Sequence, residues 1–242
     1  MTLLVLMYHR AQTDRFGNDA AMLDAHFAYL RRHYACILPG EPLDPQRLNV
    51  CLTFDDAYYD FFAVAYPLLS KHGLCAVLAV SPGLIIERVE AVEGTRLALS
   101  SYDAYAYPER GGLCTWTELR QLALDPRIAF AAHGRTHVRL DNYRADLSRE
   151  IADAKTVLQE RLCREVNSFV YPFGGFNAET QVWARKFYRH VFRIGQASNR
   201  GWQAPLLYRV VADGMSTPES LFTPARLLRY RCNALWNRAR GV

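Results

Sequence analysis

Two adjacent carboxylates, Asp55 and Asp56, directly follow an apolar run early in the chain. The run, residues 50–54, is typical of a buried strand. Burying a carboxylate is costly unless it is paired or bound to a metal, so two in tandem after a core strand need an explanation. A helix cap followed by a turn residue is one explanation, because Asp favours the N-cap position. Metal binding or acid–base chemistry at the end of the strand is the other.

Two histidines, His133 and His137, follow a second apolar run at residues 128–132. Side chains four residues apart share one face of a helical or turning backbone, so both imidazoles can bind the same cation. A single histidine more often packs in a core with its hydrogen bonds satisfied. The pair, placed after a strand and before a helix, favours metal binding.

A third segment, Tyr171-Pro172-Phe173-Gly174, carries another apolar run into a turn. A turn of this kind can aim backbone N–H groups at a substrate oxygen. Taken alone, it is a weak indication of function.

Short apolar runs alternate with amphipathic segments along the whole chain, and these must position the three segments. Strands apolar on both faces are expected at residues 3–7, 50–54, 75–80, 128–132, 167–171 and 190–194. Helical spacing is found at residues 22–33, 59–72, 115–124, 143–162 and 178–187. The alternation predicts an α/β fold, either an open parallel sheet or an incomplete barrel. All three segments then lie at carboxyl ends of strands, where such folds place their ligand sites.

The three segments, taken in order, resemble the motifs of the polysaccharide deacetylases of carbohydrate esterase family 4. They are Thr53-Phe54-Asp55-Asp56, His133-x-x-x-His137 and Tyr171-Pro172-Phe173-Gly174. The resemblance covers roughly residues 50 to 175 and is specific in combination. It implies a distorted (β/α) barrel. It also implies hydrolysis of acetamido groups on N-acetylglucosamine-type sugars, or of acetyl esters.

The resemblance also implies a role for each matched residue. Asp56, His133 and His137 would hold a divalent metal, and Asp55 would be the general base that deprotonates a metal-bound water. The backbone N–H of Phe173 would donate to the oxyanion. Two imidazoles and one carboxylate leave open positions on a metal, as hydrolysis requires. Zinc is the expected ion, and iron, cobalt or nickel would fit the same ligands; the same set is also the facial triad of Fe(II) oxygenases.

The chain departs from the family pattern in three places. Val170 stands where the family usually has an Arg that orients the base, and neither an Asp-x-x-Asp-Trp motif nor a late Leu-x-His motif is found. A catalytically weak deacetylase-like domain that binds carbohydrate or a partner is therefore the alternative to an active enzyme.

In the family the late Leu-x-His motif supplies the general acid. In this chain a general acid could come from the end of the N-terminal strand. Tyr8-His9 closes the first predicted strand and is similar to the N-terminal Tyr-His of a circularly permuted branch that includes bacterial poly-N-acetylglucosamine deacetylases. By that resemblance His9 would be the general acid that protonates the leaving amine. A packing histidine at a strand end is the alternative.

One catalytic domain is expected to span residues 1–242, with two peripheral features. Residues 82–112 form a long irregular insertion, and its Tyr102, Tyr105 and Tyr107 are expected to border the site. Residues 223–241 form a basic amphipathic helix that either docks on the barrel or lies on an anionic membrane surface. In the second case the substrate could be a lipid-linked sugar, such as an intermediate of O-antigen, lipopolysaccharide or another surface polysaccharide; a nucleotide-linked sugar is a further option.

Composition sets the remaining expectations. The chain has 242 residues, a net charge of +5 and a pI of about 8.9, without the dense Lys/Arg block of nucleic-acid-binding proteins. Its six cysteines form no Cys-x-x-Cys pair, which favours reduced thiols. The apolar N-terminus has no basic region ahead of it, and no run approaches the roughly 20 apolar residues of a membrane span. A cytoplasmic protein is expected, and the membrane alternative for residues 223–241 would place it at the inner face of the membrane.

Overall fold

The computed structural model describes residues 2–142 and 146–239, in which eight parallel strands form one sheet. The strand bounds are β1 Leu3–Tyr8, β2 Ala35–Cys36, β3 Asn49–Phe54, β4 Ala76–Val80, β5 Ile128–Ala132, β6 Ser168–Val170, β7 His190–Ile194 and β8 Leu207–Val211.

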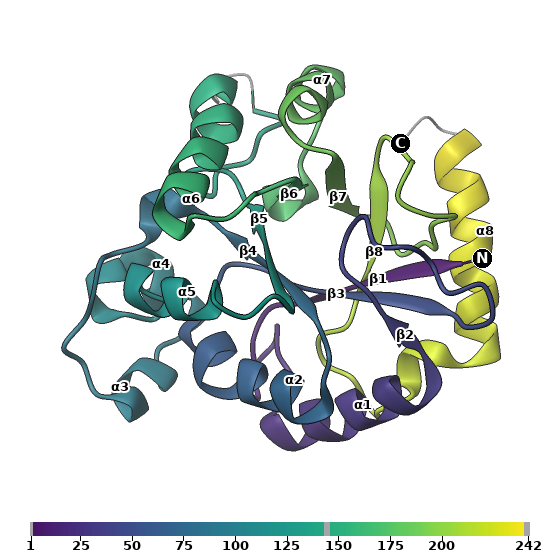
Figure 1. Cartoon of the computed structure of the whole chain (residues 1–242), viewed down its shortest axis with the longest axis horizontal. Coiled ribbons are helices and arrows are strands. Elements are labelled where there is room, and N and C mark those ends of the chain that lie inside the picture. The colour runs from purple at the N-terminus through teal and green to yellow at the C-terminus, as the bar shows by residue number, and fades with distance from the viewer. Residues whose placement is uncertain (1, 143–145, 240–242) are drawn as a thin grey trace.

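The sheet closes on itself because β1 has partners on both sides. It pairs with β3 from Leu3↔Asn49 to Tyr8↔Phe54, and with β8 from Val5↔Arg209 to Met7↔Val211. These pairings join β1 and β3–β8 into a seven-stranded barrel, seen at the centre of Figure 1. The expected (β/α) barrel is thereby confirmed. β2 is short and adds to the first two residues of β3.

Side chains of the strands alternate between the barrel interior and the layer beneath the helices. On β1, Leu3 and Val5 belong to the inner cluster, whereas Leu4 and Leu6 pack with the helices. Because both faces are covered, these strands are apolar throughout, which is why they were recognisable as uninterrupted apolar runs.

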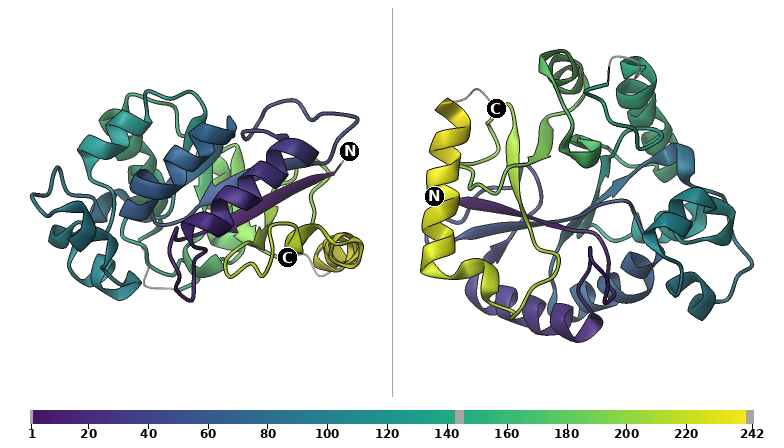
Figure 2. Two further views of the ribbon diagram at one scale, coloured as in Figure 1. Left: turned by 90° about the horizontal axis from the view of Figure 1, so that it is seen from below. Right: turned by 180° about the vertical axis from the view of Figure 1, so that it is seen from behind.

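Helices surround the barrel, as Figure 2 shows from two further sides. Their bounds are α1 Ala20–His33, α2 Tyr66–His72, α3 Glu93–Leu97, α4 Ser101–Ala106, α5 Trp116–Leu122, α6 Ala154–Leu162, α7 Ala178–Phe187 and α8 Pro224–Ala239. Two of them are preceded by a π-helical turn, at Phe61–Ala65 before α2 and at Ser148–Asp153 before α6. None of the helices within the described residues is long and apolar enough to cross a bilayer.

The six predicted strands are all present, with ends that differ by at most a residue or two. Two strands were missed. β2 is too short to show a pattern, and β8 carries Arg209 in the middle of its apolar run.

The predicted helices differ from the structure mainly at their starts. A continuous helix from residue 143 is wrong, because Asp146 is not helical; residues 143–145 lie outside the described part. The helix expected at 223–241 is found as α8, with Gly241 again outside the described residues.

The prediction that residues 82–112 are irregular is wrong, because this insertion contains α3 and α4. Ser100 caps α4 by accepting a hydrogen bond from the backbone N–H of Asp103. The buried guanidinium of Arg96 ties the insertion to α5 through Glu118 and donates to the carbonyl of Gly111. Helices this short give no periodicity that a sequence pattern could reveal.

Candidate active site

The two carboxylates lie where β3 leaves the barrel. The backbone N–H of Asp55 still donates to the carbonyl of Tyr8 on β1 at 2.8 Å. Asp56 and Ala57 then adopt left-handed backbone conformations, with φ of 71° and 52°. Each such non-glycine residue costs on the order of 1–3 kcal/mol and persists only where its surroundings hold it. This sharp turn directs the two neighbouring carboxylates to different partners.

Asp56 faces the two histidines. Its Oδ1 lies 3.4 Å from Nε2 of His133 and 3.2 Å from Nε2 of His137. Burial by itself would raise the pKa of Asp56, but the two imidazoles outweigh it and hold the pKa well below its usual range.

These three side chains fit a divalent cation. One ligand atom from each of Asp56, His133 and His137 lies within 4.8 Å of the others. His133 presents Nε2 because its Nδ1 donates to the carbonyl of Val170 at 2.9 Å, which is the usual outer support of a metal-binding imidazole. Within residues 2–142 and 146–239, the buried Oδ1 of Asp56 has no hydrogen-bond partner, so it is available as a ligand.

A buried carboxylate on the helix side shapes the loop that carries both histidines. Glu150 accepts hydrogen bonds from the backbone N–H groups of Arg135 and Thr136 at 2.8 and 2.9 Å, and from the Thr136 hydroxyl at 2.6 Å. Gly134 lies against it with φ of 68°, and a Cβ there would stand 3.1 Å from Glu150 Oε2. His137 follows with a left-handed φ of 57°. The loop therefore has little freedom to move His137 away from Asp56.

Asp55 is paired with a buried arginine from β8. Arg209 donates from Nη1 and Nη2 to the two carboxylate oxygens at 2.6 and 2.8 Å, and from Nη1 to the Thr53 hydroxyl at 3.1 Å. Both charged side chains are almost wholly buried, at 1% and 3% exposure. Burial raises the pKa of Asp55, but the charge and hydrogen bonds of Arg209, with the neighbouring imidazoles, lower it overall. Asp55 is therefore ionised at neutral pH.

His9 directly follows β1 and lies beside this pair. Its Nδ1 lies 2.6 Å from Oδ2 of Asp213, its backbone N–H donates to Oδ1 of Asp213 at 3.0 Å, and its Nε2 lies 3.8 Å from Oδ2 of Asp55. Burial lowers the pKa of His9, but the hydrogen bond to Asp213 and the nearby carboxylates raise it to about 9. The imidazole is thus protonated at neutral pH, with Nε2 directed toward Asp55.

Two aromatic rings flank His137. The ring of Phe173 lies 4.6 Å away and the ring of Tyr105 lies 4.7 Å away, centroid to centroid. Phe173 has a left-handed φ of 56°, and the turn it belongs to is closed by the N–H of Gly174 donating to the carbonyl of Tyr171 at 3.0 Å. In the described part of the chain, the buried hydroxyl of Tyr105 has no partner.

Of the three tyrosines expected to border the site, Tyr105 contacts a predicted site residue. Tyr102 and Tyr107 are exposed, at 74% and 40%, and Tyr107 stacks with Arg110 instead.

The structure brings all the predicted site residues to one end of the barrel: His9, Asp55, Asp56, His133, His137 and Phe173. Sequence reasoning missed Arg209, Asp213 and Glu150. An apolar run ending in Val211-Ala212-Asp213 was the available signal for the first two, since it mirrors the run that ends in Asp55. No sequence pattern marked Glu150.

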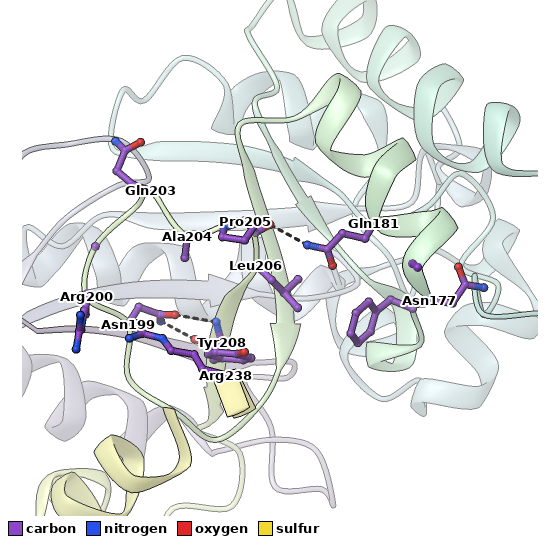
Figure 3. Close-up of a pocket in the computed structure, with 13 residues that line it drawn as sticks. Asn177, Gln181, Asn199, Arg200, Gln203, Ala204, Pro205, Leu206, Tyr208 and Arg238 are labelled. Carbon is purple, nitrogen blue, oxygen red and sulfur yellow. Dashed lines mark hydrogen bonds between the residues drawn. The ribbon is translucent and has the colours of Figure 1, made fainter. Parts of the chain in front are cut away.

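A cavity of about 950 Å³ lies apart from these residues, between the start of α7 and the segment that leads into β8 (Figure 3). Its walls include Gln181, which donates to the carbonyl of Pro205, and Asn199, which bonds the backbone of Tyr208. No predicted site residue lines it, so the chemistry expected from the sequence belongs to the barrel end and not to this cavity.

Comparison with known proteins points to one family. Residues 44–191, more than half of the chain, match the family model described as polysaccharide deacetylase. YxkH of Bacillus subtilis (strain 168), named as a polysaccharide deacetylase, is 25% identical over 230 residues, which cover 88% of this chain and 73% of YxkH.

Two solved structures share the fold. BC0361, a polysaccharide deacetylase from Bacillus cereus, is 16% identical with a TM-score of 0.74, over 94% of this chain and 69% of BC0361. The Streptococcus pyogenes deacetylase PplD, in complex with acetate, is 22% identical with a TM-score of 0.70, over 91% of this chain and 96% of PplD.

Proposed function

The chain belongs to the polysaccharide deacetylase family, and on this premise we propose that it is a metal-dependent hydrolase that removes the acetyl group from an N-acetylated sugar. The observation that carries the proposal is the placement of the Asp56, His133 and His137 donor set beside an ionised Asp55 and a protonated His9.

Asp56, His133 and His137 would hold the metal, for which zinc is the first choice and iron, cobalt or nickel are alternatives. When bound, the cation would supply Lewis acidity toward the acetyl carbonyl and the attacking water. His133 is held in position by its hydrogen bond to the carbonyl of Val170. The loop that carries His137 is held by the hydrogen bonds that Glu150 accepts from its backbone, so both imidazoles are positioned without a bound ion.

Asp55 would be the general base. It is ionised because of Arg209, and so it can accept the proton of the water that attacks the acetyl carbon. The bidentate contact with Arg209 also fixes the orientation of the carboxylate.

His9 would be the general acid. Amine is a poor leaving group until it is protonated, so cleavage of the C–N bond requires a proton at the nitrogen. The Asp213 contact occupies Nδ1 of His9, which leaves the proton on Nε2 to be delivered. The products are acetate, formed from the attacking water and the acetyl group, and the free amine of the sugar.

The Phe173 backbone N–H would donate to the oxyanion, since its turn lies against His137. A donor of this kind contributes on the order of 3 kcal/mol to transition-state stabilisation.

Arg209 weighs against the alternative of a weak or inactive deacetylase-like domain. That alternative rested on Val170 standing in place of the arginine that orients the base, and on the missing late Leu-x-His motif. Here an arginine from β8 pairs with Asp55, and His9, directly after β1, is the candidate for the acid. The same two groups favour hydrolysis over an Fe(II) oxygenase, which has no need of a paired base and acid.

We also propose where the enzyme acts. Six free thiols, Cys36, Cys51, Cys75, Cys114, Cys163 and Cys232, suit a reducing compartment such as the cytoplasm. A nucleotide-linked or lipid-linked precursor of a surface polysaccharide, such as O-antigen, would be available as a substrate there.

The test measures metal content and acetate release on the same preparations. The metal-loaded protein is expected to release acetate from N-acetylated chito-oligosaccharides or from a nucleotide-linked N-acetyl sugar. His133→Ala should lose both stoichiometric metal and acetate release while its melting temperature changes little. His72→Ala, a histidine paired with Asp24 on the outside of the barrel, is the matched control. Full metal occupancy in His133→Ala would overturn the ligand assignment, and no acetate from any of these substrates with metal bound would overturn the reaction.

A further inference from the structure

The outward face of α8 is apolar. Along its length, six residues recur at helical spacing and are all exposed: Ala225, Leu228, Cys232, Leu235, Trp236 and Ala239. Leu228 and Leu235 are each 63% exposed and Trp236 is 59% exposed. We call these six residues the outward stripe. Figure 2 shows α8 at the outer edge of the molecule.

The opposite face of α8 holds the helix to the barrel through apolar packing and hydrogen bonds. Tyr230 and Ala234 are buried there. Asn233 donates to the carbonyl of Gln196 at 2.8 Å, and Asn237 donates to the carbonyl of Gly195 at 3.1 Å. One of the two alternatives for residues 223–241 was that the apolar face of the helix, which includes Leu228 and Leu235, packs on the barrel. The structure excludes this, because that face points away.

The charges on α8 have one sign. The helix carries four arginines, at positions 226, 229, 231 and 238, and its sequence contains no acidic residue. With about 100° between successive residues, Arg229 lies along one side of the outward stripe, and Arg231 and Arg238 lie along the other. An apolar stripe edged by arginines on both sides fits a surface that is apolar within and anionic at its boundary. A bilayer with anionic headgroups is such a surface, in which tryptophan and the arginine stems also sit well.

We propose that α8 docks the protein on an anionic lipid surface through the outward stripe. A second copy of the chain is a poorer occupant, because a two-fold contact would set the arginines of one helix against those of the other. The proposal goes beyond the deacetylase reaction and does not rest on it, since no residue of the candidate active site lies on α8.

The experiment is co-sedimentation of the full chain with vesicles. One set contains phosphatidylcholine alone, and the other contains phosphatidylcholine with phosphatidylglycerol. The protein is expected to sediment with the anionic vesicles and to bind them less as salt rises. Leu228→Ser combined with Leu235→Ser should weaken binding by more than about tenfold, because two large side chains no longer enter the apolar layer.

The charge contribution is tested separately. Arg229→Gln combined with Arg231→Gln should weaken binding by about fivefold for each arginine. Leu124→Ser, at an 84% exposed leucine after α5, and Arg32→Gln, at an exposed arginine of α1, are the matched controls and should bind as the unaltered chain does.

Several outcomes would overturn the proposal. The proposal fails if the protein does not bind anionic vesicles or binds the two vesicle sets equally. It also fails if the leucine double variant binds as well as the unaltered chain. Sedimentation equilibrium on the same proteins, without lipid, identifies a different occupant. A dimer that dissociates in the leucine double variant would assign the stripe to a second copy. Melting temperatures of all variants should match that of the unaltered chain, since every substituted side chain is exposed.

Discussion

The pairing of Arg209 with Asp55 leads to a prediction that distinguishes two roles for Arg209. It either only stabilises the fold or also supports Asp55 as the general base. Arg209→Met removes one member of a buried, bidentate ion pair whose partner is 3% exposed. Breaking such a pair leaves an uncompensated buried charge and costs about 3–5 kcal/mol. For a chain of this size each kcal/mol lowers the melting temperature by about 2–4 °C, so we expect a loss of roughly 6–20 °C.

The same substitution should change the pH dependence of activity. Arg209 is the main influence that lowers the pKa of Asp55 against burial. Without it the base is protonated over a wider acidic range, so the acidic limb of the kcat/KM profile should move to higher pH. The assay is acetate release as a function of pH on metal-loaded protein, with metal content measured alongside.

Arg10→Met is the matched control, because Arg10 forms another buried pair, with Asp60 at 2.8 Å, and is not among the main influences on the pKa of Asp55. It should lower the melting temperature without moving the acidic limb. If Arg209→Met loses stability but keeps the acidic limb of the unaltered enzyme, Arg209 is a packing residue, and the assignment of Asp55 as the base it supports loses its main argument.

Three further predictions follow from the same end of the barrel and from the core beside it. Asp55→Asn should keep stoichiometric metal and lose activity, whereas Asp56→Asn should lose the metal itself; equal metal loss in both would show that the roles are misassigned. His9→Ala should keep the metal and lose about 10²–10⁴-fold in amide hydrolysis, while an acetyl ester with a phenolate leaving group should suffer far less, and equal losses on both substrates would make His9 structural. His26 is buried and neutral, with its pKa lowered to about 4 by burial, while its Nδ1 donates to the carbonyl of Pro218 and its Nε2 accepts from Tyr8 at 2.8 Å. Since the unfolded chain protonates this side chain near pH 6.5, up to about 3 kcal/mol of stability should be present above pH 6.5 and be lost as the pH falls toward 4. His26→Gln should flatten this part of the melting-temperature profile, and an unchanged slope would contradict the assignment.

Much of the fold could be predicted because the strands of a covered parallel barrel are apolar on both faces. Residues 128–132 and 190–194 were located without error for that reason. β8 was missed because Arg209, the partner of Asp55, interrupts its apolar pattern. A buried arginine is tolerated there only because Asp55 neutralises it, and that partner lies more than a hundred residues away in sequence.

The candidate site was predictable where its residues cluster in short motifs, and not where they act through others. His133 and His137 are spaced so that both can bind one ion, and Asp56 belongs to a pair of adjacent carboxylates after a strand. Asp213 and Glu150 are single carboxylates whose meaning comes from what they touch, namely His9 and the backbone of the histidine loop. Such contacts cannot be predicted from a sequence pattern. They depend on how β8 and the π-helical turn before α6 pack against the site.

The closure of the barrel by β1 has a consequence for the order in which the protein is built. During synthesis, β1 can pair with β3 once the first third of the chain has emerged, but it must wait for β8, near the other end, before its second edge is covered. Contacts of such long sequence separation are slow to form. Asp56, His133 and His137 all precede β8 in the chain. The partners of Asp55 and His9 come later, because Arg209 lies on β8 and Asp213 directly after it. Under the proposed roles, a chain that ended before β8 would contain every metal ligand but would lack the residues that orient the base and the acid.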